Sequence, residues 1–409
     1  MSRAVQLDIA GHVTRPATRV PTFGWAIRKG RRLQILLLAL VTVVSTPAVR
    51  FSAARDPGTP WGQDAEAADF SPAVLVETRW LMSSIHSSGA LALTPEKEIV
   101  VPYFSNIAML TLLDIAPPLA GSYIDWYLDN INRPDRWGLP GTIYDFRIRG
   151  DELIPTYDYD SADAYAATFL TLVSEYYRKT GDIEFVRRRR PRIDMVAGVL
   201  TSLQDGDGLV RVKPRDSNKY LMDNCEDFKG LVDWAYVLDA LGDGESAARC
   251  RAAAARIAAA VEYRLWDEKA SCYAWRIDRA NLASKPSWRK WYPDAVAQLY
   301  PALSGLISPS SMRARVLYDK FNRAFPYWPD VRMRHGYPWG LVARYAMTQG
   351  DKGRAMEFLG SAGSRFVETG GPHPWYCLES AMFIETCKAA GHRGSPGTGA
   401  TAAAPAAGM

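Results

Sequence analysis

Three carboxylates lie within five positions of one another in the stretch "YLMDNCEDFKGL", which runs from Tyr220 to Leu231. They are Asp223, Glu226 and Asp227, and an apolar helical pattern follows them. Helix capping explains part of the group, because Asp suits a cap position and the helix dipole stabilises an acid in the first turn. The apolar neighbours predict a buried helix, and burial beside another negative charge raises the pKa of a carboxyl. A carboxyl with a raised pKa can act as a general acid.

A second group, "YDYDSADAYAATFL", interleaves acids with tyrosines. Its acids are Asp158, Asp160 and Asp163, and Tyr159 stands between the first two. Capping accounts for one or two of these acids, but not for three acids that alternate with aromatic rings. Carboxylates bind sugar hydroxyls and tyrosine rings pack against sugar faces, so the group predicts a ligand-binding site.

Three more apolar helical patterns are preceded by aromatic residues together with an acid or a histidine. These residues are Trp291, Tyr292 and Asp294 in "KWYPDAVAQLYPAL", His335 and Tyr337 in "RMRHGYPWGL", and His373, Trp375 and Glu379 in "GGPHPWYCLESAMF". A paired, structural role is an equal alternative for Glu379, and packing is the more common role of a histidine such as His335. The recurrence of one pattern at several helix starts favours a shared site.

The elements that would position these groups are helices separated by short Gly, Pro and Asp breaks. The helices are predicted to begin near Phe70, Pro102, Leu119, Ser161, Asp182, Asn224, Glu245, Pro293, Pro309, Gly336, Asp351 and Pro374. Helices that are apolar nearly all round alternate with amphipathic ones, which distinguishes buried helices from solvent-facing helices. The pattern predicts an all-α fold, an (α/α)6 toroid of six inner and six outer helices, with short β-hairpins at "DGLVRVKP" and "SCYAWRID". A two-domain all-α protein is the alternative.

In such a toroid, the N-terminal ends of the inner helices line a funnel at one face. The acidic and aromatic residues are predicted to lie at these ends. An ionisable group there either faces the funnel or is buried at a cost in free energy. The fold would therefore bring together groups that are far apart in the sequence.

Both ends of the chain are predicted to lie outside the toroid, which would span residues 69–391. Residues 1–54 are interpreted as a signal peptide or a membrane anchor, because "RKGRR" precedes an apolar run at 33–45 that is shorter than the roughly 20 residues of a spanning helix. Residues 55–68 would be a linker, and the Ala-, Gly- and Pro-rich residues 392–409 a disordered tail. We therefore expect a periplasmic or extracellular protein, with residues 33–45 as a membrane tether if the segment is retained.

The charge distribution argues against nucleic acid as a partner. The first 54 residues hold eight basic groups and one acid, which leaves 41 basic and 43 acidic groups in the rest of a chain whose net charge is +5. The five cysteines include no Cys-x-x-Cys pair, so neither a zinc site nor a disulfide framework is predicted. We expect a monomer that needs no metal or other cofactor.

These features together resemble the six-hairpin glycosidases, the (α/α)6 superfamily, over about residues 70–390. "MDNCEDFKG" looks like the glucoamylase-type signature Asp-x-x-Glu-Glu followed by Gly, in which the first Glu is the general acid. Asp223 then matches the Asp, Glu226 the acid and Gly230 the Gly, while Asp227 replaces the second Glu. "DSADAYAATFL" is similar to the Asp-rich helix start of endoglucanase-like members, where such acids hold the sugar.

The resemblance implies a glycoside hydrolase of the inverting kind that acts on an oligo- or polysaccharide. Glu226 is predicted to be the general acid. Asp294 and Glu379 are the first candidates for the base, followed by Asp160, and Asp163 would bind the substrate together with Asp223. A non-catalytic carbohydrate-binding or scaffold protein on the same toroid is the main alternative, and a polysaccharide lyase is a weaker one.

Overall fold

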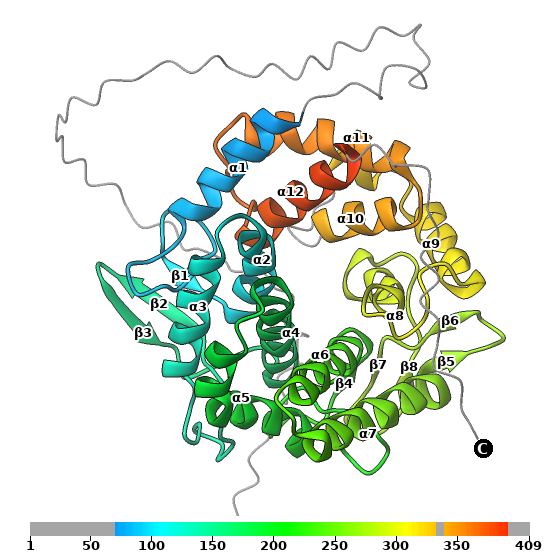
Figure 1. Cartoon of the computed structure of the whole chain (residues 1–409). Helices are drawn as coiled ribbons and strands as arrows, with labels where there is room; N and C mark the ends of the chain where they lie inside the picture. Colours follow the sequence, from blue (N-terminus) through cyan, green and yellow to red (C-terminus); the bar gives the residue numbers. More distant parts are fainter. Residues whose placement is uncertain (1–69, 333–338, 392–409) are drawn as a thin grey trace, which may run out of the picture. The chain divides into compact units, whose positions relative to one another are not determined.

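The computed structural model describes residues 70–332 and 339–391, which belong to one compact unit of the chain. The predicted all-α toroid is confirmed, because the α-helices of these two ranges form a ring in which outer and inner helices alternate (Figure 1). The outer helices are α1 (Ser71–Ser83), α3 (Pro117–Asp129), α5 (Ile183–Leu203), α7 (Gly244–Ala260), α9 (Met312–Ala324) and α11 (Lys352–Ala362). The inner helices are α2 (Pro102–Ile115), α4 (Ala162–Thr180), α6 (Leu221–Ala240), α8 (Tyr300–Leu303), α10 (Gly340–Thr348) and α12 (Cys377–Gly391).

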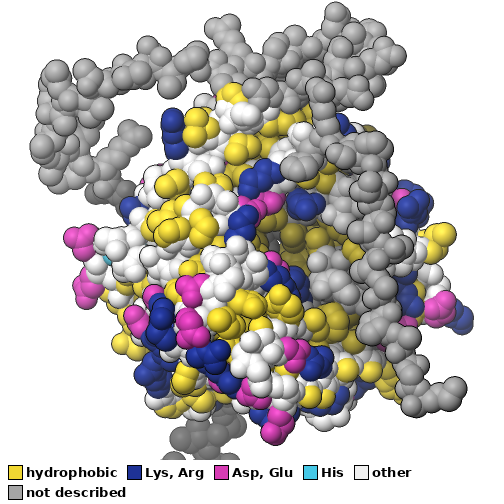
Figure 2. Space-filling view, viewed as in Figure 1, with side chains coloured by type: hydrophobic (Ala, Val, Ile, Leu, Met, Phe, Trp, Pro, Cys, Tyr) yellow, Lys and Arg dark blue, Asp and Glu magenta, His cyan; other side chains and the backbone are white. Residues whose placement is uncertain are grey.

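The predicted signal or anchor (1–54), linker (55–68) and tail (392–409) lie outside the described residues. Among the helices in the described ranges, none combines the length and the apolar character needed to cross a membrane. Figure 2 shows acidic and basic side chains interspersed over the face that it presents.

Burial separates the two layers of helices as the apolar pattern predicts. Inner helix α4 buries 14 of its 19 residues, whereas outer helix α9 buries five of 13. The inner helices therefore have protein on nearly every side, and an ionisable group on one of them must be paired, protonated or directed toward an opening.

Two glycines allow inner helices to approach each other closely. A Cβ atom built on Gly230 of α6 would lie 2.6 Å from the backbone oxygen of Ala167 in α4, and one on Gly340 of α10 would lie 2.6 Å from the Cβ atom of Met382 in α12. Any larger residue at either position would require the two helices to separate. The glycine that matches the glucoamylase-type signature thus has a packing role in this fold.

The first and last helices close the ring. In Figure 1, α1 lies beside α12, and the buried carboxylate of Glu77 in α1 accepts a hydrogen bond from the indole nitrogen of Trp375 at 2.9 Å. These two residues are 298 positions apart in the sequence. The contact between the ends of the described chain therefore completes the toroid.

Short antiparallel strands form three small sheets. Strands β1 (Ile99–Val100), β2 (Phe146–Arg149) and β3 (Glu152–Pro155) pair in that order, with Phe146 opposite Pro155. Strands β4 (Lys219–Tyr220), β7 (Arg276–Ile277) and β8 (Ala283–Ser284) form the second sheet, and β5 (Trp266–Asp267) pairs with β6 (Cys272–Tyr273). Strand β4 runs directly into α6, so this sheet leads the chain into the helix that carries the first acid group.

The expectations for two kinds of element need correction. The segment "DGLVRVKP" contains isolated bridges instead of a hairpin, and "SCYAWRID" holds β6 and β7, which pair with other strands and not with each other. The helix predicted near Pro293 consists of a π-helical turn (Trp291–Ala295), a 3-10 turn (Val296–Leu299) and the short helix α8, and Tyr292 near its start has an extended backbone. The other described helices begin within a few residues of the predicted positions.

Candidate active site

Acids from two neighbouring inner helices gather where α4 and α6 begin. Asp163 lies in the first turn of α4, and Asp223, Glu226 and Asp227 lie in the first two turns of α6. The close contact of Gly230 with α4, one turn further along α6, holds the two sets of acids together. We call these four residues the acid cluster.

The acids of this cluster do not cap their helices. The N-cap residues of α4 and α6 are Ser161 and Tyr220, and neither makes a side-chain capping bond. The outer helices α5, α7 and α11 are capped instead by Asp182, Asp243 and Asp351, whose carboxylates accept from backbone N–H groups. Capping therefore explains acids on the outer layer and leaves the inner acids without that role.

Several carboxyl oxygens of the cluster are buried without a hydrogen-bond partner among the described residues. They are both oxygens of Asp227 and the Oδ2 atoms of Asp163 and Asp223. Burial, followed by the negative charges of neighbouring acids, raises the pKa of Asp163 and Asp227 well above the usual range and that of Asp223 to about 7. The raised pKa values favour the neutral form of Asp163 and Asp227, since an ionised carboxylate without a partner is costly to bury.

Glu226 is the member of the cluster that keeps partial exposure. The hydroxyl of Tyr103, from the first turn of α2, donates to its Oε1 atom at 2.7 Å, and the hydroxyl of Tyr300 at the start of α8 lies 3.4 Å from that of Tyr103. Desolvation and the charge of Asp223 raise the pKa of Glu226 well above its usual range, while the bond from Tyr103 opposes this shift. The raised pKa favours the protonated form of Glu226, which is the state that a general acid requires.

A second group of polar side chains adjoins the cluster. The hydroxyl of Tyr165 in α4 donates to Asp145 at 2.9 Å, and burial raises the pKa of Asp145 to about 7. Asp160 is partly buried and its negative charge raises the pKa of Asp223, while the ammonium group of Lys213 opposes the rise in the pKa of Asp160 itself. Acids therefore extend from the cluster to the loop that precedes α4.

Sequence analysis missed Asp145 and Tyr103. Tyr103 directly follows Pro102 at a predicted inner-helix start, so the rule that identified the other aromatic residues would have found it. Asp145 lies between two aromatic residues just before β2, where no helix start draws attention to it.

The two first-ranked candidates for the base are held by backbone amides. Asp294 is buried and accepts from the N–H group of Ser287 at 2.8 Å, while Glu379 accepts from those of Trp339 at 3.0 Å and Gly340 at 2.7 Å. Burial raises the pKa of Glu379 to about 7. Within the described ranges, neither residue shares a hydrogen bond with Glu226 or shifts its pKa. Their catalytic role stays a prediction.

The structure places the predicted substrate-binding residues in different environments. Tyr159, Trp291 and Trp375 are buried among protein atoms; Tyr292 is partly buried; Asp158 and His373 are exposed. Tyr159 donates to Asp135 at 2.7 Å and Trp375 bonds to Glu77, so both have structural contacts. His335 and Tyr337 lie outside the described residues, and binding by the whole set stays a prediction.

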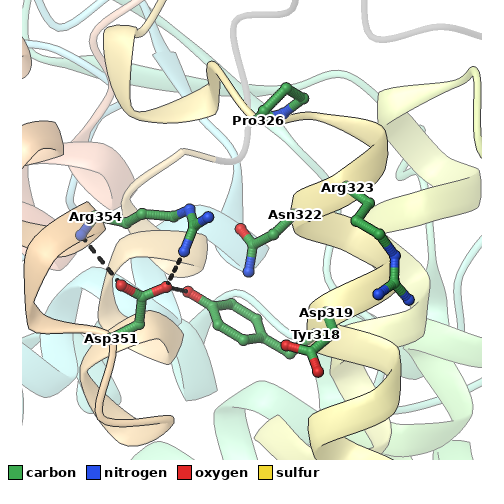
Figure 3. A pocket seen from close by; sticks show the side chains of 7 residues that line it. All are labelled: Tyr318, Asp319, Asn322, Arg323, Pro326, Asp351 and Arg354. Carbon is green, nitrogen blue, oxygen red and sulfur yellow. Dashed lines mark hydrogen bonds and ion pairs between the residues drawn. The ribbon is translucent and has the colours of Figure 1, made fainter.

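A surface hollow of about 360 Å³ lies on the outer layer of helices, at residues of α9 and α11 and the loop after α9. In Figure 3, the carboxylate of Asp351 points between Tyr318 and Arg354, and hydrogen bonds join it to both residues. These groups satisfy one another, so the hollow contributes nothing to the acid cluster. Among the described residues, no group of three or more His, Cys, Asp or Glu side chains is arranged to hold a metal ion.

Comparison with solved structures shows that the fold is shared with glycosidases. The wild-type form of one glycosidase matches with a TM-score of 0.57 and 14% identity, over 78% of this chain and 96% of that chain. A metal-independent α-mannosidase of Streptococcus pneumoniae, in complex with α-1,6-mannobiose, has a TM-score of 0.60 and 12% identity over 78% of this chain and 94% of its own. A rhamnosidase from Klebsiella oxytoca with rhamnose bound has a TM-score of 0.54 and 13% identity over 78% and 64% of the two chains.

Sequence comparison adds no closer assignment, since no protein-family model and no curated protein matches the chain. The structural matches confirm the general resemblance to toroidal glycosidases. The finer likeness to glucoamylase-type and endoglucanase-like enzymes stays a prediction.

Proposed function

We propose that this protein is a glycoside hydrolase that acts on an oligo- or polysaccharide, with Glu226 as its general acid. The observation that carries the proposal is the environment of Glu226, a partly exposed residue whose carboxyl has a raised pKa, is hydrogen-bonded to Tyr103 and is surrounded by inner-helix starts. The shared fold with glycosidases supports the same class of reaction.

In the proposed reaction, Glu226 donates its proton to the glycosidic oxygen as the bond to the anomeric carbon breaks. A second carboxylate removes a proton from a water molecule that attacks the anomeric carbon from the opposite face. Inverting enzymes hold these two carboxyls about 6.5–9.5 Å apart. Activity should fall as the pH rises through the raised pKa of Glu226, because the ionised form has no proton to donate.

Asp160 is the base that the electrostatics favour among the three predicted candidates. It is partly exposed and interacts electrostatically with Asp223, whereas Asp294 and Glu379 are buried and bonded to backbone amides. Burial raises the pKa of Asp160 as well, but the positive charge of Lys213 opposes this rise and favours the ionised form that a base requires. Asp160→Asn should therefore lower hydrolysis more than Asp294→Asn or Glu379→Gln at equal folded content.

Glu226→Gln provides the direct test of the proposal. The side-chain amide of glutamine does not act as a general acid toward the leaving oxygen. The rate of reducing-end release should therefore fall by about 10²–10⁴-fold. The substrates are α-mannosides, α-glucosides and α-rhamnosides, and circular dichroism verifies that the variant is folded. Wild-type rates from a folded Glu226→Gln variant would refute the assignment. Proton NMR of the first-formed anomer separates inversion from retention.

A non-catalytic carbohydrate-binding protein is the second candidate. It is favoured by the backbone amide bonds of Asp294 and Glu379, which give both acids a structural role. It predicts glycan binding without hydrolysis, and calorimetric titration alongside the activity assay separates the two functions.

Export is also part of the proposal, because a basic stretch precedes the apolar run at residues 33–45. Cell fractionation of the full chain tests it, and recovery of all the protein in the cytoplasm would contradict it.

A further inference from the structure

Tyr157 is a large aromatic residue that the fold holds outward. Its side chain is 58% exposed and its backbone φ is +58°, in the left-handed region that bulky residues rarely adopt. It lies in the loop between β3 and α4, three residues before Asp160. Bulky residues in this conformation persist only where the surrounding structure fixes them.

The backbone on both sides of Tyr157 is fixed by a single residue of the neighbouring strand. The N–H group of Thr156 donates to the carbonyl of Asp145 at 2.8 Å, and the N–H group of Asp145 donates to the carbonyl of Asp158 at 2.9 Å. The hydroxyl of Thr156 also donates to the carbonyl of Asp158 at 3.0 Å. Asp145 therefore bonds to Thr156 and to Asp158, and Tyr157 lies in the bulge between these two residues at the end of the β2–β3 pair.

A continuous row of aromatic rings leads from Tyr157 to the acid cluster. Its ring centroid lies 5.6 Å from that of Tyr144, which stacks on Tyr159 at 5.9 Å. Tyr159 lies 6.5 Å from Tyr165, which stacks on Tyr103 at 6.3 Å, and Tyr103 donates to Glu226. Tyr157 is thus the exposed end of a ring system whose other end holds the proposed acid.

The surroundings of Tyr157 combine aromatic and polar groups. The guanidinium group of Arg136 lies 4.1 Å from the ring centroid of Trp137 and 3.5 Å from the carboxylate of Asp158. Tyr144 and Tyr159 are buried, exposed by 6% and 2%, so Tyr157 is the ring of its loop that a ligand can reach. An exposed ring beside charged hydrogen-bonding groups matches the apolar face and hydroxyl rim of a sugar.

We propose that Tyr157 forms an outer sugar-binding subsite, which makes the protein act on oligosaccharide chains in preference to single-sugar glycosides. The proposal rests on the proposed glycosidase function and specifies its substrate class. A sugar unit remote from the scissile bond would stack on Tyr157, and its binding free energy would help to position the scissile bond beside Glu226.

The test compares substrates of different length on the full chain. Tyr157→Gly removes the ring, and glycine adopts a positive φ without strain, so the bulge is retained. We expect the ratio of kcat/KM for a tetrasaccharide to kcat/KM for an aryl monosaccharide of the same sugar to fall about fivefold or more, the size of one aromatic contact. Tyr157→Phe should retain the ratio, and Tyr263→Ala, which removes a tyrosine that is 87% exposed in the π-helical turn Val261–Leu265, is the matched control. A ratio within twofold of wild type in Tyr157→Gly would overturn the subsite.

A binding measurement separates this proposal from the function on which it rests. If the wild-type chain hydrolyses no glycoside of the panel, the hydrolase proposal fails, and titration calorimetry with the same tetrasaccharides then tests the subsite alone. Binding that weakens about fivefold in Tyr157→Gly would support the subsite. Equal affinity of both chains, or no binding by the wild type, would overturn it.

Discussion

At the level of single residues, the acid cluster lowers the stability of the protein at neutral pH. Asp163, Asp223 and Asp227 all have carboxyl oxygens that are buried without a partner among the described residues. Each must stay protonated in the folded state or be ionised at a cost in free energy. Such a cost is maintained most often where function requires it, and the negative charge that an ionised Asp223 carries raises the pKa of Glu226.

Asp223→Asn should stabilise the protein in a pH-dependent way. The pKa of Asp223 is raised to about 7 in the folded state, above the value of about 3.9 expected when unfolded. The unfolded carboxyl therefore loses its proton first, and wild-type stability falls as the pH rises from about 4 to 7. The Asn variant lacks this loss, so its free energy of unfolding should exceed that of wild type by roughly 1–3 kcal/mol at pH 8.

Urea denaturation at pH 4 and pH 8 measures this difference. At pH 4 the two chains should have nearly equal stability, since the wild-type carboxyl is then largely protonated in the folded state. An equal difference at both pH values would show that the raised pKa of Asp223 has no part in it.

Sequence patterns predict the acids at this scale but not their environments. Glu226, Asp163 and Asp223 are adjacent to one another in the fold as expected, because all lie at inner-helix starts. Tyr159 and Trp375 are predicted to bind a ligand, and both are buried with hydrogen-bond partners in the protein, so their binding role stays a prediction. An aromatic residue beside an acid has the same local sequence whether it binds a ligand or packs in the core. Only the tertiary contacts distinguish these two roles.

At the level of elements, the approach of α4 to α6 sets the geometry of the acid cluster. Gly230 contacts the backbone at Ala167, and Asp163 lies one helical turn before that contact. Helix starts themselves are predictable, because Pro and Asp breaks and the change between apolar and amphipathic patterns mark them. The π-helical and 3-10 turns that precede α8 are not, because the apolar pattern of this segment is the same as that of a regular α-helix.

Gly230→Ala should destabilise the protein and reduce its activity. The new Cβ atom would lie 2.6 Å from the backbone oxygen of Ala167, so α4 and α6 must separate, at a cost of roughly 1–3 kcal/mol. The separation also displaces Asp163 from the acids of α6. Thermal unfolding and the rate of glycoside hydrolysis measure the two effects.

Gly198→Ala on the outer helix α5 is the matched control. No atom lies within 4 Å of a Cβ built there, so alanine should stabilise the helix by about 0.5–1 kcal/mol. The prediction about helix approach is wrong if the two glycine variants change stability in the same direction.

At the level of the whole molecule, the ring is closed by residues from its two ends. Glu77 of α1 and Trp375 beside α12 are both buried, and the indole N–H group donates to the carboxyl oxygen at 2.9 Å. Inner helices α2, α4 and α6 contact one another in turn, and α12 contacts both α2 and α10, so the ring should unfold as one cooperative unit. The 12–14% identity to other toroids shows that layer pattern, more than particular residues, specifies this architecture.

Glu77→Ala should weaken closure of the ring, whereas Glu77→Gln should largely preserve it. Alanine leaves the indole N–H group of Trp375 buried without an acceptor, at a cost of about 1–3 kcal/mol, while the amide oxygen of glutamine can still accept. Chemical denaturation monitored by tryptophan fluorescence and by circular dichroism checks both variants. Equal destabilisation by the two would assign the effect to packing and not to the hydrogen bond.

Glu77 and Trp375 are 298 positions apart in the sequence, so during protein synthesis the ring cannot close until α12 has been made. At about 5–20 residues per second, α12 leaves the ribosome roughly 15–60 s after α1. During that interval α1 has no α12 to pack against, and its buried residues, including Leu81 and Glu77, are accessible to water and to chaperones. The order of synthesis therefore makes the first helix of the toroid the last to acquire its partner.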